Sequence, residues 1–213
     1  LGPPRIARTA RLVDGDTSDG RIAIGFEPPI PAGERATVAI DYRVESPREG
    51  MIWSPADARH GSAQIHTQGQ PESSRYWFPC WDFPDERVTT ELIATVPGAG
   101  EGGPVVSSNG RLVERTSDED ADTETWHWRQ DEPHATYLVS LVVGDFETTD
   151  VGGETRAGRV DMPVYTLRER GGGGARERDI RATFGRTAEM TRRFENLIDE
   201  AYPWHRYAQL VVR

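Results

Sequence analysis

Short apolar runs separated by turn residues occupy most of this 213-residue chain, and they favour strands over helices. The pattern extends from Arg5 to about Tyr165 at the spacing typical of antiparallel sheets. With 22 Gly and 15 Pro, the chain has the many turns that such a domain requires. We therefore expect a mostly β protein with antiparallel sheets.

Several segments have the length and apolar content of strands. We expect strands at Arg21–Phe26, Ala36–Val44, Glu91–Val96 and Tyr137–Phe146. The last of these is apolar enough to be a central strand that is buried on both faces.

Two features between these strands predict local structure. Val105–Glu114 contains the dipeptide Asn109-Gly110, which is typical of a two-residue hairpin turn, and we expect a hairpin there. The acidic run Asp118–Asp122 is expected to be a solvated loop.

His127, between two Trp residues in an expected strand, should be an outward polar side chain.

The periodicity changes near the carboxyl end. Four glycines at Gly171–Gly174 predict a flexible connection, since they lack the Lys-Ser/Thr of a phosphate loop. Apolar residues then recur at helical spacing, which predicts one amphipathic helix from Arg176 to about Glu200. Ala201–Trp204 should end this helix, and Gln209–Val212 resembles a new strand.

Composition argues against two classes of partner. A net charge of −10 is opposite to the basic surface that nucleic acid requires, so no nucleic-acid partner is expected. No apolar run approaches the ~20 residues that cross a bilayer, and Leu1–Arg5 does not resemble a signal peptide, so no membrane partner is expected. The compartment stays unknown.

The segment Thr67–Glu86 is the strongest candidate for a site. Gln68 and Gln70 occupy alternate positions, so on an extended chain both amides would point the same way. A dense aromatic block follows and is broken by Pro79 and Pro84, which predicts a rigid corner. Residue chemistry alone leaves open that the two amides are a solvated pair at a sheet edge.

Other reactive side chains lack the spacing of known sites. The five histidines show neither His-Glu-x-x-His nor any other metal-ligand spacing, and His60 and His66 are expected to have ordinary polar roles. Cys80 has no neighbouring base and is expected to be a small buried hydrophobe.

Thr67-Gln68-x-Gln70 followed by Phe78-Pro79-Cys80-Trp81-Asp82-x-Pro84 is similar to the Thr-Gln-x-Glu…Phe-Pro-Cys-x-Asp-x-Pro signature of the aminopeptidase N family of zinc metallopeptidases. Further similar segments follow in the same order, at Ser107–Gly110, Pro133–Leu138, Val142–Phe146 and Met162–Tyr165.

The resemblance implies a fold and a division of the chain. Residues 1–168 would be a saddle-shaped, antiparallel, β-sandwich-like amino-terminal domain. Residues 169–213 would hold the linker, first helix and first strand of a truncated α/β thermolysin-like catalytic domain. The remaining catalytic domain of the same polypeptide would then be a partner of this part.

The resemblance also implies a function. The parent protein would be a zinc aminopeptidase, in which a zinc-activated water hydrolyses the first bond of a peptide. Zinc is expected in the parent and none in this part, which alone should be inactive. Gln70 would face the free amino end of the peptide substrate, and Gln68 would line the same pocket.

One position departs from the commonest family pattern. Gln70 stands where Glu is usual, so the hydrogen-bond acceptor remains but its charge is lost. An ammonium group should then be held less tightly, by roughly 1 kcal/mol or more. This leaves open a second reading, a non-catalytic protein-interaction scaffold of the same fold, and a third, a carbohydrate-binding β-sandwich suggested by the aromatic residues.

Overall fold

The structure is a computed structural model that describes residues 9–14, 22–59, 61–100, 102–169 and 177–212. The chain divides into two compact units, residues 1–45 and 46–213. Each unit is described by itself below.

The first unit contains one small sheet. Strand β1 (Thr9–Asp14) pairs antiparallel with β2 (Ala23–Glu27), and the register shifts between Leu12 and Asp14. The strand predicted at Arg21–Phe26 is confirmed as β2 from Ala23 on, whereas Arg21 lies outside the described residues.

The strand predicted at Ala36–Val44 is wrong. The segment forms no strand, and its alternating apolar side chains lie exposed, with Ile40 42% and Tyr42 55% accessible. A strand requires a hydrogen-bonded neighbour, and β2 pairs only with β1 among the described strands. The apolar residues do alternate along this segment, but no described strand pairs with it.

The second unit contains a three-stranded antiparallel sheet in the order β5-β8-β7. Its strands are β5 (Val88–Pro97), β7 (Arg111–Asp118) and β8 (Thr123–His134). The strand predicted at 91–96 is confirmed as part of β5. Trp126 and Trp128 are buried whereas His127 faces the other way, as predicted, and contacts Glu91. Residues 119–122 form the exposed turn between β7 and β8, which confirms the solvated acidic loop except for Asp118, the last residue of β7.

A four-stranded sheet lies beside it, in the order β3-β4-β9-β6. It consists of β3 (Met51–Ser54), β4 (Gln64–Thr67), β6 (Val105–Ser108) and β9 (Leu141–Gly144). Val106 of β6 is fully buried and packs with Trp126 and Trp128 in one core cluster. This cluster joins the two sheets.

The long central strand predicted at Tyr137–Phe146 is only partly confirmed. The 3-10 turn η2 (Thr136–Leu138) comes first, and Phe146 already begins the next strand, β10 (Phe146–Asp150). Only Leu141–Gly144 is a central strand, between β4 and β6. Apolar continuity did not reveal the turn, which is held by a backbone hydrogen bond from Val139 N to Thr136 O.

The hairpin predicted at Asn109-Gly110 is wrong. Strands β6 and β7 belong to different sheets, so the dipeptide is a corner between sheets. Asn109 holds this corner by donating to Leu138 O at 2.8 Å and accepting from Ser140 N at 2.7 Å. Gly110 has φ +77°, and a Cβ there would lie 1.9 Å from Arg129 O. The turn-forming chemistry was predicted correctly, but the pairing of the flanking strands was not.

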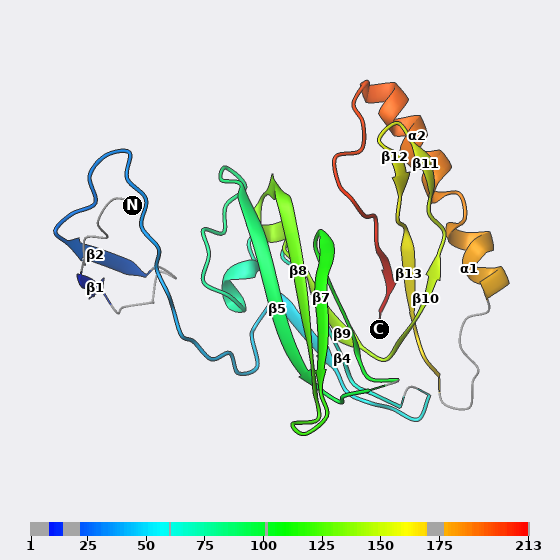
Figure 1. Ribbon diagram of the computed structural model, residues 1–213, viewed down its shortest axis with the longest axis horizontal. Helices are drawn as coiled ribbons and strands as arrows, with labels where there is room; N and C mark the ends of the chain where they lie inside the picture. The colour runs from blue at the N-terminus through cyan, green and yellow to red at the C-terminus, as the bar shows by residue number, and fades with distance from the viewer. Residues whose placement is uncertain (1–8, 15–21, 60, 101, 170–176, 213) are drawn as a thin grey trace. The chain divides into compact units, whose positions relative to one another are not determined.

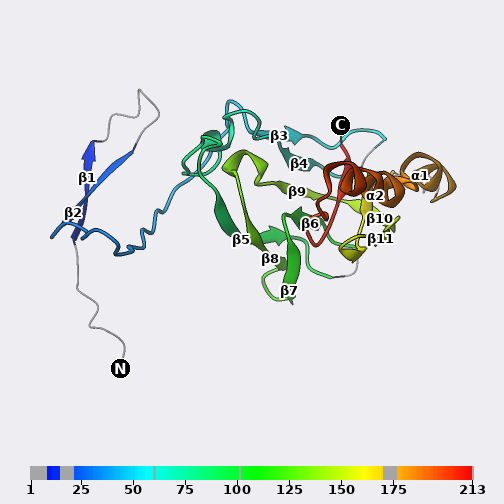
Figure 2. The same cartoon turned by 90° about the horizontal axis from the view of Figure 1, so that it is seen from above.

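The remaining strands lie next to the helices (Figures 1 and 2). β13 (Pro163–Leu167) lies between antiparallel β10 (Phe146–Asp150) and parallel β14 (Gln209–Val211). β11 (Gly153–Thr155) and β12 (Gly158–Val160) form a short hairpin. The strand predicted at 209–212 is confirmed as β14.

The predicted single helix is two helices, α1 (Glu177–Phe184) and α2 (Thr187–Ile198). They are separated at Gly185 and Arg186, where a Cβ on Gly185 would lie 2.4 Å from Arg181 O. Gly171–Gly174 and Arg176 lie outside the described residues. Asp199, in the left-handed conformation at φ +58°, follows the end of α2, so the predicted stop near residue 200 is confirmed.

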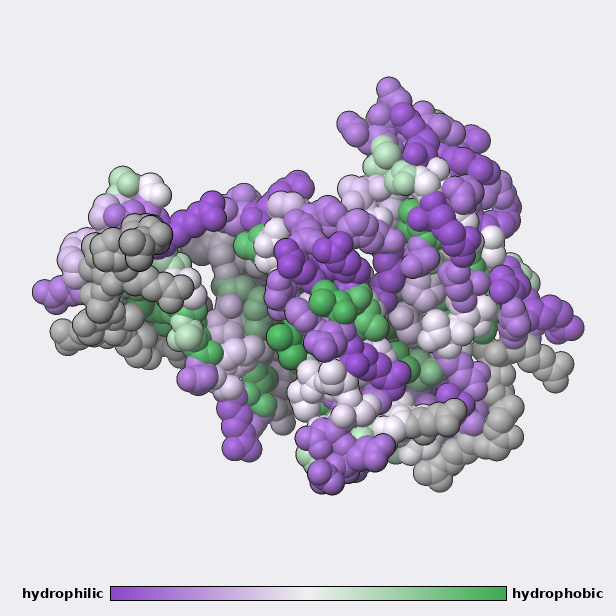
Figure 3. Space-filling view, viewed as in Figure 1, coloured by the Kyte–Doolittle hydropathy of each residue, from purple (hydrophilic) through white to green (hydrophobic). Residues whose placement is uncertain are grey.

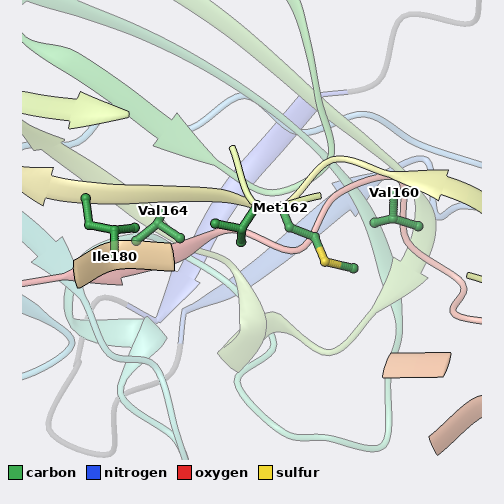
Figure 4. Packing of buried hydrophobic residues seen from close by; sticks show 5 residues of the cluster. Val160, Met162, Val164 and Ile180 are labelled. Carbon is green, nitrogen blue, oxygen red and sulfur yellow. The ribbon is translucent and has the colours of Figure 1, made fainter. Parts of the chain in front are cut away.

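The apolar residues of the two helices have different surroundings. Ile180 of α1 is 4% exposed and packs with Val160, Met162 and Val164 (Figure 4). In α2 the buried positions are instead Thr187 and Glu195. We call the exposed apolar side chains of α2 the α2 stripe: Met190, Phe194, Leu197 and Ile198, at 48%, 64%, 67% and 66% exposure.

Polar side chains cover much of the surface seen in Figure 3, with smaller apolar patches between them. No helix within the described ranges has the length and apolar character needed to cross a membrane. The division at residues 168 and 169, the saddle shape and the thermolysin-like second domain all stay predictions.

Candidate functional site

Gln68 and Gln70 lie just beyond the end of β4, and both are exposed. The extended conformation expected through Gln70 ends earlier, because β4 stops at Thr67 and Gln70 begins a turn. The backbone N of Gln68 donates to Gly50 O at 2.9 Å. Neither amide side chain has a hydrogen bond within the described part of the chain, so both are available to a ligand.

The backbone between the two amides is tightly enclosed. A Cβ on Gly69 would lie 2.4 Å from Tyr137 O and 2.7 Å from Ser74 Oγ. Ser73 N donates to Gly69 O at 2.8 Å and closes the turn that follows. Gly69 is therefore the residue that lets this backbone approach the segments around Ser74 and Tyr137. This close approach fixes the backbone positions of Gln68 and Gln70 on either side of it.

Hydroxyl groups connect this turn to the segment before β9. Ser74 Oγ, which is fully buried, donates to Thr136 O at 3.0 Å. Thr136 Oγ1 in turn donates to Trp81 O at 2.8 Å. Thr67 Oγ1 accepts a hydrogen bond from Leu141 N at 2.9 Å. The threonine of the sequence motif thus has a structural role, since it attaches the end of β4 to the start of β9.

The aromatic block is a rigid corner, as predicted. The short helix η1 (Ser74–Tyr76) turns the chain, and Trp77 behind it is 8% exposed. Arg75 Nε donates to Asp82 Oδ2 at 3.1 Å, and the Arg75 guanidinium lies 5.3 Å from the Phe83 ring centroid. Oδ2 of Asp82 is therefore occupied in closing the corner, whereas its buried Oδ1 has no hydrogen-bond partner among the described residues.

Cys80 is a poor nucleophile. Burial, followed by the charge of Asp82, raises the pKa of the Cys80 thiol to about 11. Little thiolate forms at neutral pH, which agrees with a structural role, but Cys80 is half-buried, so the predicted buried position is only partly confirmed.

The histidines are dispersed. His60 is outside the described residues, and His66 is half-buried, with a pKa lowered by that burial. His134 lies 3.1 Å from Glu132 O, and His205 pairs with Glu132 at 3.2 Å. Within the described ranges, no three His, Cys, Asp or Glu side chains are grouped so that they could hold a metal ion. The described residues do not form a zinc site, and no reaction step is assigned to them.

Sequence reasoning missed two cavities in the second unit, of about 500 and 350 Å³, which share Gly110 and Arg206. Gln68 and Gln70 line neither of them. Arg206 stands in the stretch His205–Tyr207, which matches no recognised motif and gave no signal. The polar side chains that line these cavities are brought together from several strands.

The fold is that of a mostly antiparallel β domain, and the loop that carries Gln68 and Gln70 is exposed beside a rigid corner. The sequence pattern of the Peptidase M1 N-terminal domain matches residues 12–138. The chain therefore belongs to this family, which is the amino-terminal domain of the aminopeptidase N family of zinc metallopeptidases.

Curated relatives include enzymes and a transcription factor subunit. Aminopeptidase B of Rattus norvegicus is 28% identical over 138 residues, which are 63% of this chain and 20% of that protein. Transcription initiation factor TFIID subunit 2 of Danio rerio is 29% identical over 143 residues, 63% of this chain and 12% of that protein. The chain thus spans about a fifth or less of the length of these relatives.

Solved structures share the fold at low identity. An M1 zinc metallopeptidase mutant from Deinococcus radiodurans, bound to a Tyr-Ser-Ala substrate, gives a TM-score of 0.57 at 20% identity and covers 75% of this chain and 34% of its own. Legionella pneumophila aminopeptidase A in complex with aspartic acid gives a TM-score of 0.57 at 18% identity. The match covers 70% of this chain and 17% of that protein.

Proposed function

We propose that this chain is the amino-terminal part of a zinc-dependent aminopeptidase that removes amino-terminal residues from peptides. The observation that carries the proposal is the match of residues 12–138 to the M1 amino-terminal domain. Similarity to aminopeptidase B and the shared fold with a peptide-bound metallopeptidase support it. Zinc would be held by other residues of the parent polypeptide, where it would activate a water for attack on the first peptide bond.

Gln68 and Gln70 are proposed to recognise the free amino end of the peptide. Their amides are exposed and free of hydrogen bonds to described residues, and the backbone between them is fixed at Gly69. An amide oxygen accepts a hydrogen bond from an ammonium group, although without the charge that a carboxylate would add. Such a contact would favour a chain end over an internal residue.

The later part of the chain is proposed to begin a second domain at residue 169. Helices α1 and α2 follow this point, and β14 joins β13 in parallel, in contrast to the antiparallel pairs before it. This part would be the start of a thermolysin-like catalytic domain. The rest of that domain would then be its partner within one polypeptide.

The test of the enzyme is hydrolysis of aminoacyl amides by the full-length protein, with and without a zinc chelator. We expect hydrolysis that stops on chelation and returns on adding zinc. Hydrolysis that survives metal removal would contradict the proposal. No hydrolysis by zinc-loaded protein would contradict it too, and would favour the non-catalytic interaction scaffold.

The test of the amide pair is Gln70→Glu in the same protein. Restoring the charge should lower KM for free-amine substrates by about fivefold, because a charged acceptor holds ammonium more strongly. Gln70→Leu should raise KM. Substrates with an acetylated amino group are the control, since they carry no ammonium. An unchanged KM in both variants would remove Gln70 from the site.

A further inference from the structure

Arg206 connects three parts of the second unit. Its guanidinium stacks on the Trp128 ring of β8 at 4.3 Å from the centroid. Its Nη2 donates to Ser107 Oγ at 2.9 Å and to Ser108 O at 2.7 Å, both in β6. Its Nη1 donates to the Tyr165 hydroxyl of β13 at 3.2 Å. The side chain is thus held firmly in one position, just before β14.

This cation has no close counter-ion. All three of its hydrogen bonds go to uncharged oxygens, and no carboxylate of the described residues forms an ion pair with it. Burial lowers the pKa of Arg206, which indicates that its charge is poorly solvated. A partly buried arginine without an acidic partner is unusual, because desolvated charges are normally paired.

Two aspartates line the larger cavity beside Arg206, and neither neutralises it. Asp150 is occupied, with Arg159 Nη2 at 2.7 Å and the backbone N of Gly152 at 2.8 Å. Asp161 is exposed and its backbone forms a β-bridge with Arg206, but its carboxylate acts on the guanidinium only through its charge. The arginine therefore keeps unused binding capacity toward a negative group.

Two N–H groups of Arg206 remain unused. The guanidinium has five N–H donors, of which the three hydrogen bonds above occupy three. One donor on Nε and one on Nη1 are left, and Nε is not among the fully buried polar atoms that lack a partner in the described residues. The Nε–H can therefore be reached from solvent.

We propose that the cavity of about 500 Å³ beside Arg206 is a binding site for a carboxylate. Its volume is within the usual range for small ligands. Arg206 supplies a charged donor, while Trp128, Tyr165 and Leu112 supply the apolar wall. The carboxylate is either the carboxyl end of a peptide or an acidic side chain. The site is separate from the amide pair and does not depend on the proposed peptidase activity.

Three capped amino acids distinguish the sources of the carboxylate. N-acetyl-phenylalanine carries a main-chain carboxylate, N-acetyl-glutamate α-amide carries only a side-chain carboxylate, and N-acetyl-phenylalanine amide carries none. Binding to the 213-residue chain is followed by NMR, at the Arg206 Nε–H and the Gly110 amide. Binding of either carboxylate compound, or of both, supports the site and names its source. Equal binding of the uncharged amide, or binding of neither carboxylate, would overturn it.

Two charge variants with a matched control test the role of Arg206. Asp161→Asn removes the nearby negative charge and should tighten carboxylate binding about three- to tenfold. Asp120→Asn makes the same charge change in the exposed β7–β8 turn and should have little effect. Arg206→Gln should weaken binding at least tenfold, provided that its circular dichroism spectrum shows it is folded. If Asp161→Asn increases the affinity for the carboxylate no more than Asp120→Asn does, the proposal is wrong. This outcome does not depend on whether Arg206→Gln folds.

Discussion

Arg75 and Asp82 are joined twice, because Asp82 Oδ2 accepts from the Arg75 backbone N at 3.0 Å and from its Nε at 3.1 Å. The Asp82 side chain is only 2% exposed, whereas that of Arg75 is 29% exposed. The same arginine also contacts the carbonyl oxygen of Asp82 at 3.3 Å. This pair closes the corner that follows the two glutamines, so it should support the candidate site without contacting a ligand.

Asp82→Asn is expected to destabilise the second unit by about 2–4 kcal/mol, because it leaves Arg75 without its buried partner. Urea unfolding followed by tryptophan fluorescence measures the change. Glu72→Gln is the control, since Glu72 meets the same arginine at 2.9 Å but is 46% exposed. Glu72→Gln should lower the free energy of unfolding by less than about 1 kcal/mol. Equal losses in the two variants would mean that the burial of Asp82 is unimportant.

Gly69→Ala should lower the free energy of unfolding by about 1–3 kcal/mol, because the added Cβ would clash with the backbone oxygen of Tyr137. Gly100→Ala is a useful comparison, since nothing lies within 4 Å of its added Cβ. The only penalty there is the left-handed backbone, of about 1–2 kcal/mol. Thermal unfolding compares them, and a Gly69→Ala chain as stable as the parent would show that the turn can relax.

The folded chain should become less stable in acid because the buried Glu195 carboxylate becomes protonated. Burial acts to raise the pKa of this carboxyl, but backbone N–H groups of Arg156, Tyr202 and Ala157 outweigh it and lower the pKa. Because the pKa is lower in the folded state, the stabilisation is complete above about pH 4.3 and is lost as pH falls through the folded pKa. Glu195→Gln should be less stable at pH 7 and should show a shallower decline below pH 4.3. Urea midpoints across pH measure this, and parallel curves would contradict the assignment.

Cys80 should react slowly with thiol reagents. With a pKa of about 11, only about a thousandth of the thiol is ionised at pH 8, against about a quarter for an ordinary cysteine. The reaction with a chromogenic disulfide should therefore be about a hundredfold faster in denaturant than in buffer. Equal rates would show that Cys80 is open and ordinary in the folded chain.

The sequence predicted strands well where one face is buried. The alternation of Trp126, His127 and Trp128 follows directly from the two faces of β8, because side chains alternate along a strand. Strand partners could not be predicted in this way. Asn109-Gly110 carried the correct turn signal, but which strands pair depends on residues far away in the chain.

The two candidate sites differ in how far the sequence reveals them. Gln68 and Gln70 stand out by their spacing before an aromatic block, but only the family motif gives them a role, and that role stays a prediction. Arg206 carries no motif at all. Its surroundings come from Trp128, Ser107 and Tyr165, each on a different strand, so only the folded chain places them together.

The α2 stripe has a practical consequence for handling this polypeptide. Phe194, Leu197 and Ile198 are each about two-thirds exposed, which is unusual for such large apolar side chains grouped on one helix. Purified 213-residue material should adhere to hydrophobic chromatography resin, brighten dyes such as ANS and self-associate as its concentration rises. Replacing Phe194 and Leu197 with serine should reduce all three behaviours, which would make the protein easier to crystallise.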